Sequence, residues 1–257
     1  PHTGTMGEYT YHKKIPHAAI TSEDAMMISR ISKRGQKVVL KLNMDGKFVE
    51  DRWSRNIIAE LKGSTYPEEI IVVGGHIDSW DVGQGAHDDA GGCVAAWRAV
   101  TLIKELGLKP RRTIRIVLWT NEENGGKGNE NYKNEHLSEL NNHILAIESD
   151  GGVFAPQGFG FTGSEKARDY ILDIASLLDP IGAGTITNWG RAADVAPLND
   201  NGVPVMSLNV DNSKYFWYHH TNADTFDKID FREFNNCIAA MAIMSYVVSD
   251  MEKKLPR

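Results

Sequence analysis

The chain has 257 residues and an ordinary globular composition, with 41% hydrophobic and 24% charged residues. Its 28 Lys and Arg against 34 Asp and Glu give a formal charge of -6, so no basic excess argues for nucleic acid or an anionic membrane as a partner. The two cysteines exclude a disulfide framework, and no apolar run approaches the roughly 18 residues that a membrane span needs.

Residues 1–50 are predicted to form a small α/β piece. Thr21 supplies a capping oxygen, apolar residues recur at helical spacing over 25–32, and Gly35 ends the pattern. Residues 37–44, with the sequence KVVLKLNM, then predict a strand. Because a piece of this size cannot bury a core alone, we predict that it belongs to a lid or an inserted domain.

From residue 51 onward, strand-like and helical patterns alternate. Strands are predicted at 70–73, 114–119, 144–147 and 203–208, and helices at 91–106, 127–137, 166–178 and 231–251. This alternation predicts an α/β fold in which helices flank a mostly parallel mixed sheet.

The first candidate site residues follow the first of these strands. His76 and Asp78 are two residues apart, so they are able to share one face. A ligating His normally donates its second ring N–H to a carboxylate, which makes Asp78 a candidate to orient His76. Alone, the pair is also typical of a strand-end His beside a solvated Asp.

An acid pair, Asp88 and Asp89, stands before the glycine-rich start of a predicted helix. One carboxylate there can bridge two cations, because it has two oxygens to offer. An Asp in this position also caps a helix that begins near Gly91. Both roles stay open, one for each Asp.

Two further strands end in acids. Glu122 and Glu123 follow the strand at 114–119, and adjacent side chains leaving a strand point in different directions. One Glu can therefore bind a metal while the other acts as a general base. Asp150 follows the next strand and precedes two glycines, which let the backbone approach a site closely.

Two histidines, His219 and His220, lie in a polar loop before the last predicted helix. One of them is a candidate final metal ligand. Asp224 in the same loop is a candidate to orient that ligand.

The order of these residues, His-x-Asp, then Asp, Glu-Glu, Asp and a late His, resembles the M28 family of co-catalytic zinc peptidases. The stretches that carry the resemblance are GGHIDSWDVGQGAHDDAGG, VLWTNEENGG, ESDGG, FTGSEKARDYI and YHHTNADT, and KIPHAAITSEDA is similar to the end of the protease-associated domain inserted in that group. The resemblance implies a zinc-aminopeptidase-type, phosphorylase/hydrolase-like α/β fold. Residues 1–50 would be a partial protease-associated domain, and residues 51–257 the catalytic domain without its upstream N-terminal elements.

Carried over residue by residue, the resemblance implies two zinc ions per chain. Asp88 would bridge both ions. His76 and Asp150 would complete one zinc site, and Glu123 and His220 the other.

The resemblance also implies roles for three other features of the site. Glu122 matches the general base of the family. Asp78 matches the residue that orients the metal ligand at the position of His76. The peptide bond between Asp88 and Asp89 is expected to be cis.

The resemblance further implies an exopeptidase that cleaves dipeptides or short peptides, in a secreted or lysosomal homodimer. Candidate substrate residues are His219, Asp194 and Arg191, whose planar guanidinium can hold a carboxylate but is equally typical of a surface Arg. Two alternatives stay open: a single-zinc acyltransferase of the glutaminyl cyclase type, and a non-catalytic binding relative of the same fold.

Overall fold

The structure separates into two compact units. The computed structural model describes residues 2–4, 16–45 and 49–257, and the chain divides into Pro1–Ser54 and Arg55–Arg257. The domain boundary predicted at residue 50 lies close to this division. That the first unit is part of a protease-associated domain stays a prediction.

The first unit contains the helix α1 (Ser22–Lys33), as predicted. Its N-terminus is capped by Thr21, whose Oγ1 accepts a hydrogen bond of 3.1 Å from the backbone N–H of Asp24. The strand predicted at 37–44 is wrong, because no residue described in this unit is in a strand. Val39 is 76% exposed, and a lone extended segment has no neighbouring strand to satisfy its backbone donors and acceptors.

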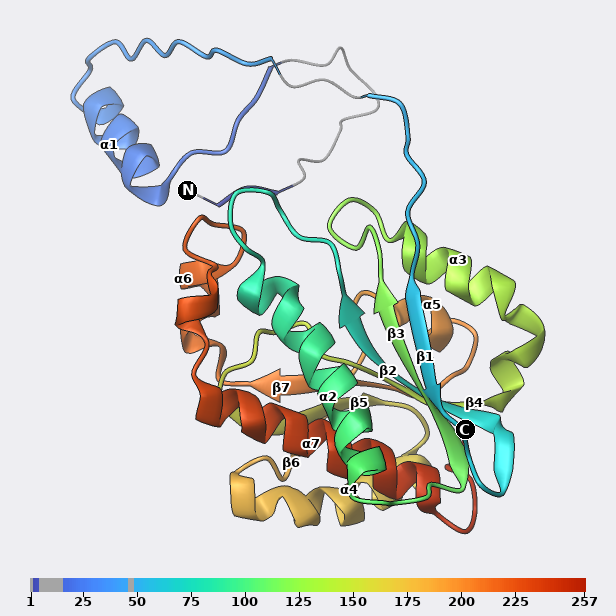
Figure 1. Cartoon of the computed structure of the whole chain (residues 1–257). Helices are drawn as coiled ribbons and strands as arrows, with labels where there is room; N and C mark the ends of the chain where they lie inside the picture. The colour runs from blue at the N-terminus through green and yellow to red at the C-terminus, as the bar shows by residue number, and fades with distance from the viewer. Residues whose placement is uncertain (1, 5–15, 46–48) are drawn as a thin grey trace. The chain divides into compact units, whose positions relative to one another are not determined.

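The second unit, all of which is described, is built on a seven-stranded mixed sheet (Figure 1). Its strands are β1 (Ile57–Leu61), β2 (Tyr66–His76), β3 (Arg112–Trp119), β4 (His143–Glu148), β5 (Pro156–Thr162), β6 (Thr185–Thr187) and β7 (Val205–Val210). They lie in the order β1-β3-β2-β4-β7-β5-β6. The β1–β3 and β5–β7 pairs are antiparallel and the other four pairs are parallel. The predicted mostly parallel mixed sheet is confirmed.

Three of these strands were not predicted from the sequence. β1 lies at one edge of the sheet with most of its residues exposed. β5 contains a proline and two glycines, and β6 has only three residues. Edge strands, very short strands and strands that contain proline and glycine lack the continuous apolar run that marks a strand buried on both faces.

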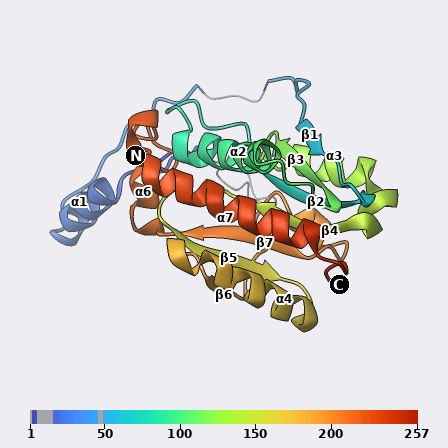
Figure 2. The ribbon, with the colours of Figure 1, turned by 60° about the horizontal axis from the view of Figure 1, so that its bottom comes forward.

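Helices cover both faces of the sheet (Figures 1 and 2). The longer ones lie where predicted: α2 (Gly91–Glu105), α3 (Lys127–Glu135), α4 (Glu165–Ala175) and α7 (Phe231–Asp250). Shorter segments are α5 (Ala196–Asn199), α6 (Tyr215–Tyr218), the π-helical turn η1 (Ala86–Ala90) and the 3-10 segments η2 (Leu137–Asn142), η3 (Ser176–Ile181), η4 (Asn212–Lys214) and η5 (Phe226–Lys228). Among the described helices, none combines the length and hydropathy of a membrane span.

Strand β2 shows how the two layers form. Ile71 and Val73 belong to the core that includes residues of α2, α4 and α7, whereas Ile70 and Val72 belong to the core that includes residues of α3 and α5. Successive side chains of a strand point to opposite faces, so a run of apolar residues supplies both cores at once.

The neighbouring strands β3, β2 and β4 bring the candidate site together. They run parallel, so their carboxyl ends meet at one edge of the sheet. His76 ends β2 and pairs with Trp119, the last residue of β3, while Gly74 pairs with Glu148, the last residue of β4. The acids that follow β3 and β4 therefore leave the sheet beside His76.

A buried histidine, His143, begins β4 at the opposite end of the strand. Its ring nitrogens contact the carbonyl oxygen of Glu139 at 3.1 Å and the hydroxyl of Tyr132 at 2.9 Å. A neutral imidazole satisfies both contacts, donating from Nδ1 and accepting at Nε2. Burial, reinforced by the nearby positive charge of Arg115, lowers the pKa of His143 to about 4.

We expect the free energy of unfolding to decrease as the pH falls from about 6.5 to about 4. In this range the unfolded chain binds a proton at His143 and the folded chain does not, so acid favours unfolding. A difference of about 2.5 pKa units corresponds to about 3 kcal/mol. Denaturant titrations of wild type and His143→Gln across this range measure the effect. The variant should lose less stability, and an equal loss in both proteins would contradict the assignment.

Candidate metal centre

Asp88, in η1, lies at the centre of the site. Its Oδ1 is 3.2 Å from Nε2 of His76, and the same nitrogen is 3.2 Å from Oδ1 of Asp150. Its Oδ2 is 3.1 Å from Nε2 of His220, which is 3.0 Å from Oε2 of Glu123. Each oxygen of Asp88 therefore faces its own pair of candidate ligands.

The spacing of these atoms fits ligands of a metal ion. Zinc binds nitrogen and oxygen at about 2.0–2.2 Å, so tetrahedral neighbours lie about 3.3 Å apart, close to the 3.0–3.2 Å observed. Oδ2 of Asp88 is buried and accepts no hydrogen bond within the described chain. Its short contact with His220 therefore fits two ligands of one ion better than a donor and an acceptor.

The electrostatics of the cluster also favour a cation. Burial, followed by the negative charge of Asp88, raises the pKa of Glu123 to about 8. Burial lowers the pKa of His76, but hydrogen bonds to Asp150 and Asp88 outweigh it and raise that pKa far above its usual value. Positive charge is thus strongly stabilised here, as a metal site requires.

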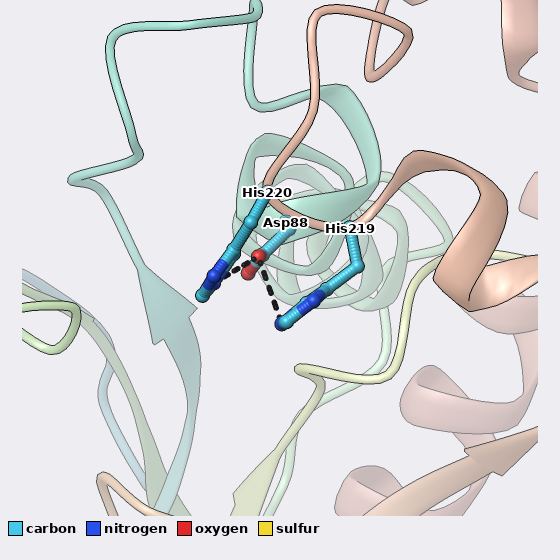
Figure 3. Close-up of side chains that lie close together, drawn as sticks. All are labelled: Asp88, His219 and His220. Carbon is cyan, nitrogen blue, oxygen red and sulfur yellow. Dashed lines mark ion pairs between the residues drawn. The ribbon is translucent and has the colours of Figure 1, made fainter. Parts of the chain in front are cut away.

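His219 also approaches Asp88. Figure 3 shows His219 and His220 converging on its carboxylate, with Nε2 of His219 at 3.6 Å from Oδ2. Asp88, His219 and His220 form one group of atoms able to hold a metal ion, and His76, Asp88 and Glu123 form another. His220 is the better candidate ligand of the two histidines, because it is closer to Asp88 and contacts Glu123.

Asp89 belongs to a third such group, with His76 and Asp150. Its carboxylate, however, accepts backbone hydrogen bonds from His76 at 3.0 Å and from Gly92 at 3.1 Å. The bond to Gly92 satisfies a backbone donor in the first turn of α2, although the N-cap residue of this helix is Ala90. The peptide bond between Asp88 and Asp89 is cis, as expected.

Asp78 acts differently from the prediction. Its backbone carbonyl oxygen, not its carboxylate, contacts Nδ1 of His76 at 2.8 Å, and the nearest carboxylate oxygen is 3.9 Å away. When a metal ion is bound, donation from Nδ1 to this carbonyl would leave Nε2 of His76 as the ligand atom. The Asp78 carboxylate instead accepts backbone hydrogen bonds from Glu122 at 3.1 Å and Glu123 at 3.3 Å. Asp78 therefore positions both glutamates.

Glu122 lies next to Glu123 in the chain, and the pKa of each is raised. For Glu122, burial, followed by the negative charge of Asp150, raises the pKa above the ordinary value for Glu. A carboxylate with a raised pKa is better matched to accepting and releasing a proton near neutral pH.

Two of the three predicted substrate residues are engaged elsewhere. Arg191 forms an ion pair with Asp200. Its Nη2 lies 2.9 and 2.8 Å from the two carboxylate oxygens of Asp200. Asp194 is 0% exposed and accepts a hydrogen bond of 3.2 Å from Asn129. A side chain this inaccessible does not support the substrate contact predicted for Asp194. His219 remains partly exposed beside Asp88.

Trp80 is a site residue that the sequence reasoning missed. Its ring lies 5.7 Å from that of His220, and with Val82 it lines a cavity that also contacts Asp88, Glu123 and His220. The sequence offered one indication of this role, because Trp80 is two residues after the candidate site residue Asp78.

His87 was missed as well. Its buried ring is stacked on Phe154 at 4.1 Å and on Tyr218 at 5.5 Å. Its Nδ1 accepts a hydrogen bond of 3.3 Å from the backbone N–H of Val153. Burial lowers the pKa of His87, so a neutral, packed ring supports the turn that carries Asp88. Its place directly before Asp88 was the only signal.

Comparison with known proteins agrees with this geometry. The profile of Peptidase family M28 matches residues 56–245. Carboxypeptidase Q from Homo sapiens is 47% identical over 257 residues, covering 100% of this chain and 54% of the relative. The chain thus spans about half the length of the curated relatives it matches.

Solved structures are similar as well. A peptidase M28 precursor from Shewanella amazonensis SB2B superposes with a TM-score of 0.94 and 37% identity, covering 100% of this chain and 58% of that one. A zinc aminopeptidase from Bacillus subtilis shares the fold, with a TM-score of 0.63 and 20% identity over 77% of this chain and 51% of its own. The chain belongs to peptidase family M28.

Proposed function

We propose that this chain carries the catalytic centre of a two-zinc exopeptidase that hydrolyses dipeptides or short peptides. The observation that carries the proposal is the Asp88 carboxylate, each oxygen of which faces a separate pair of ligands. His76 and Asp150 would hold one zinc with Asp88, and Glu123 and His220 the other. Membership of a peptidase family supports the reaction, and the relative from Bacillus subtilis, a zinc enzyme, supports the choice of metal.

The chain's own residues supply the proton transfers and the positioning. Zinc, when bound, lowers the pKa of water and polarises a carbonyl group. The Glu122 carboxylate takes a proton from the attacking water and delivers it to the amine that leaves when the peptide C–N bond breaks. Asp78 positions Glu122, because its carboxylate accepts a hydrogen bond of 3.1 Å from the backbone N–H of Glu122.

Apolar side chains border the candidate metal site. Trp80 and Val82 line a cavity together with Asp88, Glu123 and His220. His219 lies beside the same cluster and is partly exposed. The apolar part of a short peptide would lie against Trp80 and Val82.

A panel of peptides tests this function. With zinc bound, the protein should hydrolyse dipeptides with free termini, and blocking the recognised terminus should lower kcat/KM by about tenfold or more, equivalent to at least about 1.4 kcal/mol of transition-state binding. Comparing N-acetylated with C-amidated substrates identifies that terminus.

Two outcomes would favour the alternatives. Conversion of an N-terminal glutaminyl peptide to its cyclised form without hydrolysis would indicate an acyltransferase of the glutaminyl cyclase type. Peptide binding without turnover would indicate a non-catalytic relative.

The family resemblance alone supports a homodimer and a secreted or lysosomal location, and we propose both. Light scattering from the purified protein tests the dimer, and fractionation of cells that express it tests the location. A monomer, or a protein confined to the cytosol, would contradict the respective proposal.

A further inference from the structure

Asp224 joins the loop of His220 to the turn that carries Asp88. Its side chain is buried, four residues after His220. Oδ1 accepts a hydrogen bond of 2.7 Å from the backbone N–H of His87, and Oδ2 accepts one of 3.1 Å from the backbone N–H of Asp88. One carboxylate thus satisfies two successive buried donors beside the central metal-ligand candidate.

The same two segments are also joined through their backbones. The carbonyl oxygen of Asp224 accepts a hydrogen bond of 2.9 Å from the N–H of Gln84. The side-chain oxygen of Gln84 accepts another of 2.9 Å from the N–H of Phe226. Within the His220 loop, the N–H of Asp224 donates to the carbonyl oxygen of Thr221 at 3.2 Å. The two segments therefore form a single hydrogen-bonded unit.

We infer that Asp224 is a positioning residue that sets the direction of the Asp88 carboxylate relative to His220, and thereby the zinc affinity of the centre. The inference rests on the proposed function. Buried N–H groups need acceptors, and a carboxylate is the side chain that can accept from two of them at once. Because both oxygens of Asp88 face candidate ligands, a rotation of its backbone would disturb both zinc sites together.

Asp224 differs in this respect from Asp78. The carboxylate of Asp78 accepts hydrogen bonds from the backbone N–H groups of Glu122 and Glu123, and its carbonyl oxygen contacts the ring of His76. Asp224 instead holds the backbone of Asp88, which both ions would share. Replacing a residue that hydrogen-bonds to a metal ligand typically lowers metal affinity by about 10–100-fold.

The test compares Asp224→Asn and Asp224→Ala with Gln84→Ala in the full-length protein. Gln84 is exposed and joins the same two segments without touching the backbone of Asp88. Asp224→Ala should weaken zinc binding by about 10–100-fold. Asp224→Asn, which keeps one acceptor oxygen, should fall between Asp224→Ala and wild type, and Gln84→Ala should bind zinc like wild type.

Three measurements separate positioning from general stability. Zinc affinity is measured by competition with a chelator, and the melting temperature is measured without metal. The absorption spectrum of the cobalt-substituted protein should change in the Asp224 variants and not in Gln84→Ala, because it responds to ligand geometry. If Asp224→Ala does not fold, the nearly isosteric Asp224→Asn decides the question.

The possible failures are distinct. Unchanged zinc affinity and cobalt spectrum in the Asp224 variants would overturn this inference, as would an equal loss in Gln84→Ala. A wild-type protein that binds no zinc would overturn the proposed function itself. A wild type that binds zinc but cleaves no peptide would overturn the proposed function and leave the positioning role of Asp224 intact.

Discussion

Glu122→Gln should lower kcat for dipeptide hydrolysis by about 10²–10⁴-fold, the usual contribution of a positioned general base. The amide cannot take the proton from water at neutral pH, although it has nearly the shape of the carboxylate. Zinc content should stay at the wild-type level, because Glu122 is not among the four side chains proposed to bind zinc with Asp88. Steady-state kinetics and metal analysis on the same preparation measure both effects.

Two companion variants sharpen this comparison. Glu135→Gln removes an acid from the exposed face of α3 and should leave kcat unchanged. Glu123→Gln should lose zinc as well as activity, because Glu123 contacts His220 at 3.0 Å. A fully active Glu122→Gln protein would remove Glu122 from the mechanism.

Removing zinc with a chelator should abolish turnover, and zinc should restore it with a stoichiometry of about two ions per chain, as expected for a two-metal site. The reason is geometric, since Asp88 presents one oxygen to each pair of ligands. Isothermal titration and activity recovery, followed on the same metal-free sample, give the count. Recovery that is complete at one ion per chain would favour the single-zinc alternative.

Measuring the zinc stoichiometry of single-ligand variants tests the role of each ligand. Asp88→Asn should impair both zinc sites, whereas His220→Ala should impair mainly the site shared with Glu123. Asp81→Asn is a matched control, because Asp81 is an exposed acid in the same loop region. Equal stoichiometries in all three variants would contradict a bridging Asp88.

The central strands of the fold were predictable because parallel strands buried on both faces are continuous apolar runs. Ile70 to Val73 fill both cores and were recognised for this reason. The same reasoning failed for 37–44, which has apolar residues but no partner strand among the described residues of its unit. It also failed for β5, where Pro156 and the glycines conceal a strand that pairs with β7.

In the site, residue types and their order were predictable, and hydrogen-bond partners were not. His76 and the acids after β3 and β4 are strand-end residues, and strand ends of a parallel sheet converge. Asp78 and Asp224 were both expected to orient histidines. Their carboxylates accept hydrogen bonds from backbone N–H groups, and the direction of those groups depends on loop conformation. The burial of Asp194 and the pairing of Arg191 with Asp200 were not predictable, because both depend on tertiary contacts.

By itself, the sequence determined the class of fold and the set of candidate ligands, because these follow from apolar periodicity and from acids and histidines placed at strand ends. The family was indicated by the resemblance of its motifs. Only the tertiary structure decided that Asp88 faces two ligand pairs, that the Asp78 carbonyl orients His76, and that Asp224 holds the Asp88 turn. The physical reason is that these contacts join residues up to 136 positions apart. Their geometry depends on where loops pack, which local sequence patterns do not encode.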